Sequence, residues 1–188
     1  MVQAGEASLA RVRSVWGKFN ELKPILTARG ASLKLKGKIY RTCVQSVMVY
    51  GSETWPMKIE DQRRLERTER MMVRSMCGVT LRDRVKSVDL YERLGVSEVA
   101  EVMRRGRLRW FEHVERKDGD DWVRACRVLE MDDERGRGRP VKTWQECINA
   151  DLSSLGEAGQ GAQDRVAWPM EECHCGKPSN PYEHGKRT

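Results

Sequence analysis

Apolar side chains recur at steps of three and four residues over most of this chain. That spacing places them on one face of an α-helix, whereas a half-buried strand alternates at every second residue. The periodic stretches are interrupted at Pro24, Gly30, Gly78 and Gly95, residue types that commonly end helices. The sequence therefore predicts a mainly α fold. The stretches expected to be helical are residues 8–22, 33–48, 58–77, 87–94, 98–116 and 144–155.

Short polar signals mark where several of these helices should begin. Ser32 and Ser97 are of the type that accepts a hydrogen bond from the first free backbone N–H groups of a helix. Thr143 and Glu146 have the spacing of a capping box. Residues 122–129 form a short apolar stretch that fits either a helix or a strand.

Glycine, proline and charge divide the chain into segments. Residues 132–142 combine charged side chains with glycine and proline and lack a core-forming run, so we predict a flexible Arg/Gly linker there. The periodicity ends after Trp168, and the tail beyond it is expected to be disordered. We expect a helical bundle at residues 1–80, a small helical C-terminal domain at 81–131, the linker at 132–142, terminal helices at 143–168 and the tail at 169–188.

Positive charge is concentrated near the beginning of the chain. The formal net charge is +7, and residues 1–50 hold nine basic and two acidic side chains. A positive field of this kind recruits phosphate backbones, although solvated lysines and arginines on an ordinary helical protein would give the same total. On the helix predicted at 33–48, we interpret the basic residues as a cationic ridge opposite the apolar stripe. The ridge comprises Lys34, Lys36, Lys38 and Arg41.

The sequence carries no targeting or membrane signal. Only 39% of the residues are hydrophobic, and no apolar run approaches the ~18 residues of a membrane span. Four of the six cysteines lie at apolar positions of helical patterns, where a free thiol behaves as a small hydrophobe. We therefore expect reduced thiols, no membrane partner and an intracellular protein, nuclear or cytoplasmic.

Arginines alternate with glycines in residues 135–139, which is the sharpest chemical signal in the chain. Followed by Pro140, the run is similar to the core of an AT-hook, a peptide that binds the narrow minor groove of A·T-rich DNA. The acidic residues 132–134 depart from strong hooks because they repel phosphate, and a plain flexible linker is the alternative. The positions expected to contact nucleic acid here are Arg135, Arg137, Arg139 and Lys142.

Arginines and aromatic residues also interleave within residues 104–111. A surface of this composition can neutralise phosphates and stack on bases. At helical spacing, however, Trp110 and Phe111 fit the apolar side, so we expect these two aromatics to belong to the core. The basic candidates for nucleic-acid contact are Arg104, Arg105, Arg107 and Arg109.

No complete catalytic or metal-binding set is present in the sequence. Cys173, His174 and Cys175 are too closely spaced to place three ligands around one tetrahedral ion. Asp120 and Asp121 follow a glycine, but no strand pattern precedes them as it would in a polymerase metal site. We therefore predict no catalytic residue, no metal site and no cofactor.

Several short segments, taken in order, resemble one known family. They are Leu33–Tyr40, Tyr50–Trp55, Leu65–Thr80, Gly106–Arg116 and Gly136–Trp144. In this order and spacing they are similar to the region after the palm in reverse transcriptases of non-LTR (LINE-type) retrotransposons, particularly the RTE-like group. The resemblance covers about residues 8–168 and rests on the combined series. The chain departs from the family pattern after Trp168.

This resemblance implies a thumb-like bundle at residues 1–80 that grips a template–primer duplex by its backbone. In such enzymes the palm carries the metal-binding aspartates and lies upstream, as does an endonuclease domain; neither is found in this sequence. Mg²⁺ is accordingly expected only for that palm. The partners that the resemblance implies are an RNA template, a template–primer duplex or target DNA, together with the rest of the polymerase.

We therefore predict the C-terminal fragment of an RNA-directed DNA polymerase that binds nucleic acid and is inactive alone. Two other interpretations stay open at this point. One is a stand-alone, AT-hook-like DNA-binding protein, and the other is a decayed retroelement product without a function.

Overall fold

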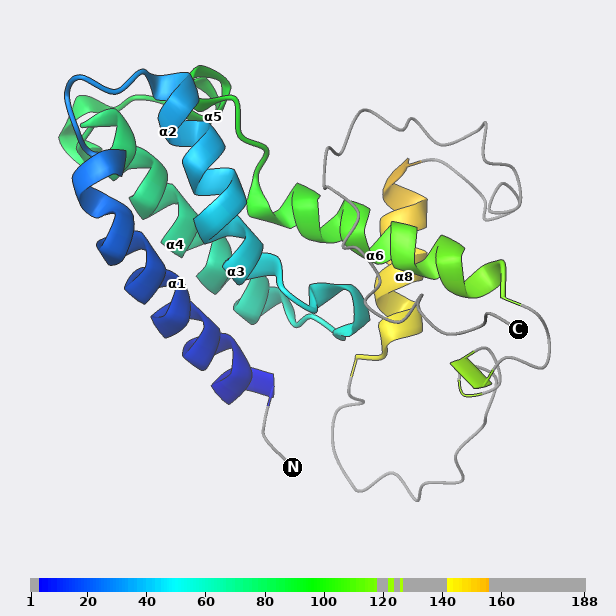
Figure 1. The fold of residues 1–188 in the computed structure, drawn as a ribbon. Coiled ribbons are helices and arrows are strands. Elements are labelled where there is room, and N and C mark those ends of the chain that lie inside the picture. The colour runs from blue at the N-terminus through cyan, green and yellow to red at the C-terminus, as the bar shows by residue number, and fades with distance from the viewer. Residues whose placement is uncertain (1–3, 118–121, 124–125, 127–141, 156–188) are drawn as a thin grey trace, which may run out of the picture.

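Three helical stretches lie side by side and form a bundle (Figure 1). They run up, down and up because short connections join consecutive helices (Figure 1). The computed structural model describes residues 4–117, 122–123, 126 and 142–155. The three stretches are α1 (Ala4–Leu26), the α2–α3 rod formed by α2 (Leu33–Ile39), η1 (Tyr40–Gln45) and α3 (Ser46–Val49), and α4 (Ile59–Cys77).

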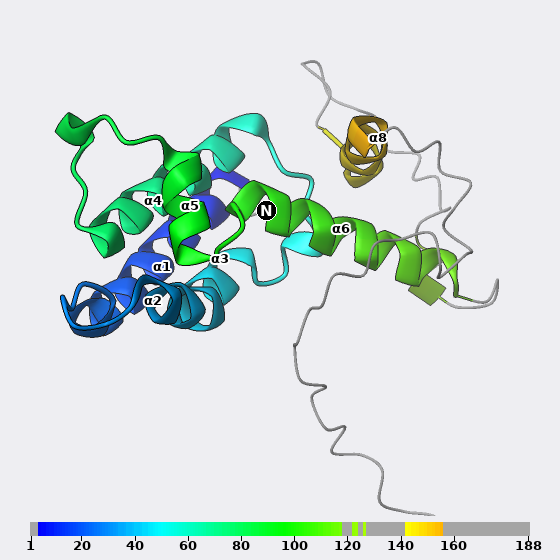
Figure 2. The same ribbon diagram turned by 90° about the horizontal axis from the view of Figure 1, so that it is seen from above.

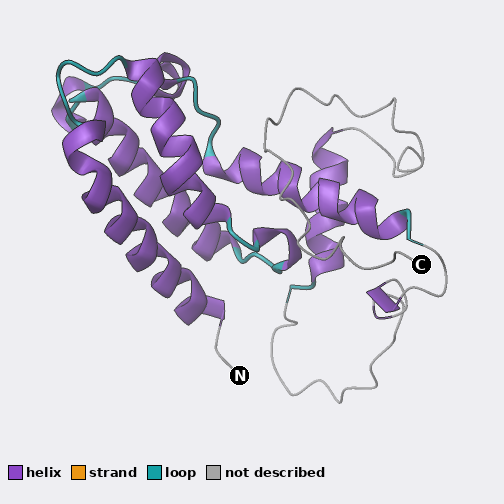
Figure 3. Ribbon diagram, in the orientation of Figure 1, coloured by secondary structure: helices purple, strands orange, loops and turns teal. Residues whose placement is uncertain are grey.

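The remaining helices cover one end of the bundle and extend away from it. α5 packs against α2 and α4, whereas α6 projects outward and is crossed by α8 (Figures 1 and 2). Every regular element in the described residues is helical, so the predicted mainly α fold is confirmed (Figure 3). These elements are η2 (Ser52–Thr54), η3 (Leu81–Asp83), α5 (Ser87–Leu94), α6 (Val99–Glu115) and α8 (Trp144–Leu155).

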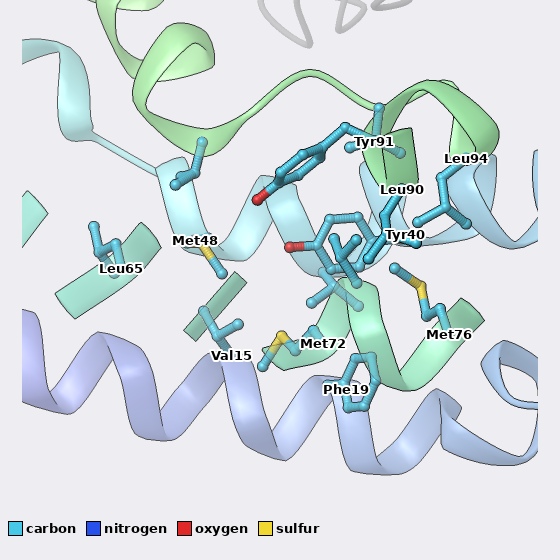
Figure 4. Packing of buried hydrophobic residues seen from close by; sticks show 14 of the residues in the cluster. Val15, Phe19, Tyr40, Met48, Leu65, Met72, Met76, Leu90, Tyr91 and Leu94 are labelled. Carbon is cyan, nitrogen blue, oxygen red and sulfur yellow. The ribbon is translucent and has the colours of Figure 1, made fainter. Parts of the chain in front are cut away.

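One hydrophobic core joins the bundle, α5 and the beginning of α6. Its buried members run along the sequence from Val15 in α1 to Met103 in α6. Figure 4 shows Met72 and Met76 of α4 packed between Phe19 of α1 and the side chains above them. The core is continuous across residue 80, so the domain boundary predicted there does not coincide with a break in packing.

Most predicted helix ends are found where local chemistry placed them. Gly78 and Gly95 end α4 and α5 with left-handed φ angles of 65° and 66°. Ser32 begins α2, and its hydroxyl accepts a hydrogen bond from the Leu35 N–H at 3.3 Å. Thr143 and Glu146 form both bonds of the predicted capping box at α8. These predictions are confirmed because each depends on residues within one turn.

Two predicted boundaries are wrong. α1 does not end at Pro24 but continues to Leu26, which is fully buried. Burial of one leucine is worth about 1.5–3 kcal/mol and offsets the single hydrogen bond that proline cannot donate. Ser97 does not cap α6; Glu98 occupies that position, and the cap comes from another helix.

Several predictions fall partly or wholly outside the described residues. They concern the linker, the C-terminal tail, the cysteine cluster at 173–175 and most of the apolar stretch at 122–129. Within the described residues, no helix is both long and apolar enough to cross a membrane. Phe111 is buried as expected, whereas Trp110 is half-buried.

Candidate nucleic-acid interface

The α2–α3 rod presents basic side chains without acidic neighbours in the sequence. No Asp or Glu occurs between Glu21 and Glu53. Lys34, Lys38 and Arg41 are exposed, and none forms an ion pair with another described residue. Their spacing of four and three residues aligns them on one side of the helix over about 10 Å. We call these three residues the α2 cationic face.

Lys36 was predicted to belong to this ridge, and the structure places it in the interior. Its residue is only 5% exposed, and its Nζ donates to the Met76 carbonyl oxygen at 3.2 Å. Two residues correspond to about 200° around a helix, so Lys36 points away from Lys34 and Lys38. Its ammonium neutralises carbonyl oxygens at the C-terminal end of α4, where a positive charge is favourable. Lys36 is therefore a structural residue.

A glycine allows α2 to approach α5 closely. A Cβ atom at Gly37 would lie 1.9 Å from the Leu94 carbonyl oxygen and 2.8 Å from its carbonyl carbon. Both are below any possible non-bonded distance to backbone atoms, which cannot move independently. Gly37 therefore fixes the separation between α2 and the end of α5, although glycine weakens an isolated helix.

The middle of the α2–α3 rod is a π-helix, and it brings two polar residues to one partner. Tyr40 and Gln45 are separated by five residues, which is about 140° around an α-helix. In the wider π-helical turn, with i→i+5 bonding, they lie on the same side. The Tyr40 hydroxyl and the Gln45 Nε2 donate to the same Glu69 oxygen at 3.2 and 3.0 Å.

Glu69 is the centre of a buried network that sequence reasoning missed. Its residue is 0% exposed, and its other carboxylate oxygen accepts from the Tyr91 hydroxyl at 3.1 Å and the Val99 N–H at 2.6 Å. Figure 4 shows that the hydroxyl groups of Tyr40 and Tyr91 point the same way. One carboxylate thus joins α4, the rod, α5 and the first turn of α6.

Burial sets the protonation behaviour of this network. It raises the pKa of the Glu69 carboxyl above its usual value, while the hydrogen bonds that Glu69 accepts act in the opposite direction. Burial also raises the pKa of both tyrosine hydroxyls. Both tyrosines therefore remain protonated donors at neutral pH. The sequence signal for Glu69 was a lone glutamate on the apolar stripe between Leu65 and Met72.

The α6 arginines do not form one common surface. Arg104 and Arg105 both pair with Glu101, at 2.6 and 2.8 Å. Arg107 is 6% exposed and pairs with Asp151 of α8 at 2.7 Å. Of the four arginines, only Arg109 is exposed without an ion pair to another described residue.

Arg107 therefore does not belong to an exposed basic surface, although it was predicted to contact nucleic acid. Its guanidinium joins α6 to α8. The predicted contacts Arg135, Arg137 and Arg139 lie outside the described residues. Lys142 is half-buried immediately before the α8 capping box. No group of metal-ligating side chains occurs within the part of the chain that the structure describes.

Segments that are distant in sequence meet where η2, α6 and α8 come together. The Trp144 Nε1 of α8 donates to the Glu53 carbonyl oxygen at 2.7 Å. A Cβ atom at Gly106 would contact the Glu53 side chain at 3.5 Å, and the rings of Phe111 and Trp144 lie 6.3 Å apart. The segments Tyr50–Trp55, Gly106–Arg116 and Gly136–Trp144 thus contribute residues to one contact region.

Comparison with known proteins supports an origin in a transposable element but identifies no family. The chain is similar to an uncharacterized transposon-derived protein of Caenorhabditis elegans, at 23% identity over 170 residues. The match covers 84% of this chain and 61% of that protein. No family model matches, and no solved structure matches. The similarity supports derivation from a transposable element.

Proposed function

We propose that this chain is the nucleic-acid-binding C-terminal part of a retrotransposon reverse transcriptase, and that it binds by the α2 cationic face. The observation that carries the proposal is the exposed row of Lys34, Lys38 and Arg41 on a stretch without acidic residues. The similarity to a transposon-derived protein supports the retroelement part. The resemblance in the motif series supports a thumb-like role.

The α2 cationic face offers positive charges that are available to phosphates. Each of these cations can neutralise one phosphate and release its condensed counterion, which makes binding strong at low salt and weak at high salt. Side chains that already form ion pairs, such as Arg104 and Arg107, contribute less because the pair must first be broken. The three residues of the α2 cationic face form no ion pair with another described residue, so no pair has to be broken before they bind phosphate.

The test compares two triple variants of the full chain. In the first, Lys34, Lys38 and Arg41 are changed to Gln. In the control, three other exposed basic residues are changed to Gln, so both variants lose the same charge. They are Lys58, which immediately precedes α4, and Arg63 and Arg67 within it. Binding of RNA–DNA hybrid, DNA duplex and single strand is measured by fluorescence anisotropy at about 150 mM salt, with folding checked by circular dichroism.

We expect the first variant to lose affinity for the hybrid by tenfold or more and the control to lose much less. Equal losses in both variants would show that binding follows net charge, and the proposal for this face would then be wrong. Binding that prefers A·T-rich duplex and depends on Arg137 and Arg139 would favour the AT-hook-like alternative. Affinity no greater than that of a charge-matched unrelated protein would favour a product without a function.

A further inference from the structure

A groove opens on the surface between α1 and α3. Its volume is about 460 Å³, and it is lined by Ala10, Arg11 and Ser14 from one side and by Ser46, Val47 and Tyr50 from the other. This volume falls within the range of about 300–1,000 Å³ that is typical of small-molecule sites. The groove exists because small side chains face each other across the two helices.

The walls of the groove offer hydrogen-bond acceptors. The Ser14 hydroxyl donates to the Ala10 carbonyl oxygen at 3.1 Å, and the Ser46 hydroxyl donates to the Thr42 carbonyl oxygen at 2.6 Å. Because each hydroxyl hydrogen is used within its own helix, the oxygen lone pairs remain for a ligand. Acceptors of this kind suit the exocyclic amino groups of nucleobases.

Tyr50 stands at the end of the groove as an exposed aromatic ring on a fixed turn. The residue is 79% exposed. Its φ and ψ of −55° and 121°, followed by 68° and 9° at Gly51, are those of a type II turn, which requires glycine at the second position. The backbone therefore sets the point at which the Tyr50 side chain leaves the turn, and the exposed ring is available for stacking.

Arg11 holds this turn in place. Its Nη1 donates to the carbonyl oxygens of Tyr50 and Val47, and its guanidinium lies 3.9 Å from the centre of the Trp55 ring. Arg11 thus donates hydrogen bonds to backbone carbonyl oxygens at the end of α3, and it adds a positive charge to the groove wall. Its partner Trp55 comes from beyond η2.

The groove continues the α2 cationic face. One wall of the groove and the α2 cationic face both belong to the α2–α3 rod, and no acidic residue occurs between them in the sequence. Exposed residues extend along the rod from the cations to the ring; they are Lys34, Leu35, Lys38, Arg41, Thr42, Ser46 and Tyr50. From Arg41 to Tyr50 the rise is about 13 Å. A strand whose phosphates contact the α2 cationic face can therefore reach the groove.

We propose that this groove binds an unpaired nucleobase of a single strand, which stacks on Tyr50 while the adjoining backbone lies on the α2 cationic face. The inference rests on the proposed function for the backbone contact. Positive potential and a stacking platform together are the usual elements of single-strand binding. The site would make the chain prefer a duplex end with an unpaired extension over a blunt duplex.

The experiment compares a blunt RNA–DNA hybrid with the same hybrid carrying a short unpaired DNA extension. The extension holds 2-aminopurine at its first unpaired position, so stacking on a protein ring changes the fluorescence of that base. The variants are Tyr50→Ala, Tyr50→Phe and Leu81→Ala. Leu81 is a matched control because it is also 79% exposed and lies in η3, away from the groove.

We expect wild type to bind the extended probe about tenfold more tightly than the blunt one, the factor expected for one stacked base. Tyr50→Ala should abolish this preference and the fluorescence change. Tyr50→Phe should keep both because it keeps the ring, and Leu81→Ala should leave both unchanged.

Other outcomes separate the failure of this inference from failure of the proposed function. If Tyr50→Ala keeps the preference, the inference is wrong, and loss of binding in the variant of the α2 cationic face would still support the proposed function. If wild type binds neither probe, both proposals are wrong. If sedimentation shows a dimer that Tyr50→Ala dissociates, without preference for the extension, the groove binds a second copy of the chain and the inference is overturned.

Discussion

The Glu69 carboxylate accepts the backbone N–H of Val99 at 2.6 Å, so a side chain of α4 caps the first turn of α6. A helix N-terminus favours negative charge because its first N–H groups lack partners within the helix. The same carboxylate accepts hydrogen bonds from Tyr40 and Gln45 of the α2–α3 rod. Glu69 thereby couples the rod that carries the proposed interface to the direction in which α6 leaves the bundle.

Replacing Glu69 by Gln should destabilise the fold strongly. The amide nitrogen would face two donors, and each buried group left without a partner costs about 1–3 kcal/mol. We expect the free energy of unfolding to fall by about 3 kcal/mol, measured by urea denaturation followed by circular dichroism. The control is Glu66→Gln on the same helix, where the ion pair with Arg70 is long at 3.9 Å and should contribute less than about 1 kcal/mol. Equal effects of the two changes would contradict the network.

The same residue should give the stability a characteristic pH dependence. The pKa of Glu69 is raised by burial, so the folded state holds this proton more tightly than the unfolded state does. Its contribution is complete below the usual carboxyl pKa and is lost as pH rises through the raised pKa. The difference in melting temperature between wild type and Glu69→Gln should therefore shrink as the pH rises above the usual carboxyl pKa of about 4. A constant or growing difference would be inconsistent with a raised pKa.

Adding a methyl group at Gly37 should separate α2 from α5. In an open helix the change from glycine to alanine stabilises by about 0.5–1 kcal/mol, but here the new Cβ would meet the Leu94 carbonyl oxygen. Gly37→Ala should lower the melting temperature. Gly17→Ala in α1, where a Cβ meets nothing within 4 Å, should raise it. A neutral or stabilising effect of Gly37→Ala would show that Gly37 does not fix the separation between α2 and α5.

Lys34 and Lys36 should behave oppositely, although they lie two positions apart. Lys36→Met should lower the stability by about 1 kcal/mol by removing the bond to the Met76 carbonyl, without changing nucleic-acid affinity in the folded protein. Lys34→Met should leave stability unchanged and reduce the salt dependence of binding by about one counterion. Thermal unfolding and anisotropy at several salt concentrations measure the two effects. A weaker affinity in folded Lys36→Met would place that lysine at the interface after all.

The purified chain should not extend a primer. Polymerase chemistry requires carboxylates that hold two metal ions, and in the reverse transcriptases that the motif series resembles these carboxylates belong to the palm and not to the region proposed here. With Mg²⁺ or Mn²⁺, primed template and deoxynucleotides, we expect no incorporation above background. Reproducible incorporation that requires the folded chain would overturn the proposal that the chain binds nucleic acid and is inactive alone.

Local patterns predicted the helices because their signals act over one or two turns. The capping box at Thr143 and the left-handed glycines at 78 and 95 depend only on neighbours within about four residues. The exposed pair Lys34 and Lys38 was also predictable, since both lie on one side of a helix. Lys36 was wrongly placed on the same side as Lys34 and Lys38. Each residue turns about 100° around the helix, so a residue two positions away lies on the opposite side.

The sequence by itself determined the mainly α fold, most of the helix ends and the concentration of positive charge before residue 50. Only the tertiary structure decided which polar groups are structural and which are available. Glu69 meets a backbone N–H that lies 30 residues away, and Trp144 meets the Glu53 carbonyl across 91 residues. Such pairs depend on how helix faces meet and on one π-helical turn that rotates Gln45 toward Glu69. No local periodicity contains that information, because it arises only when separate helices pack together.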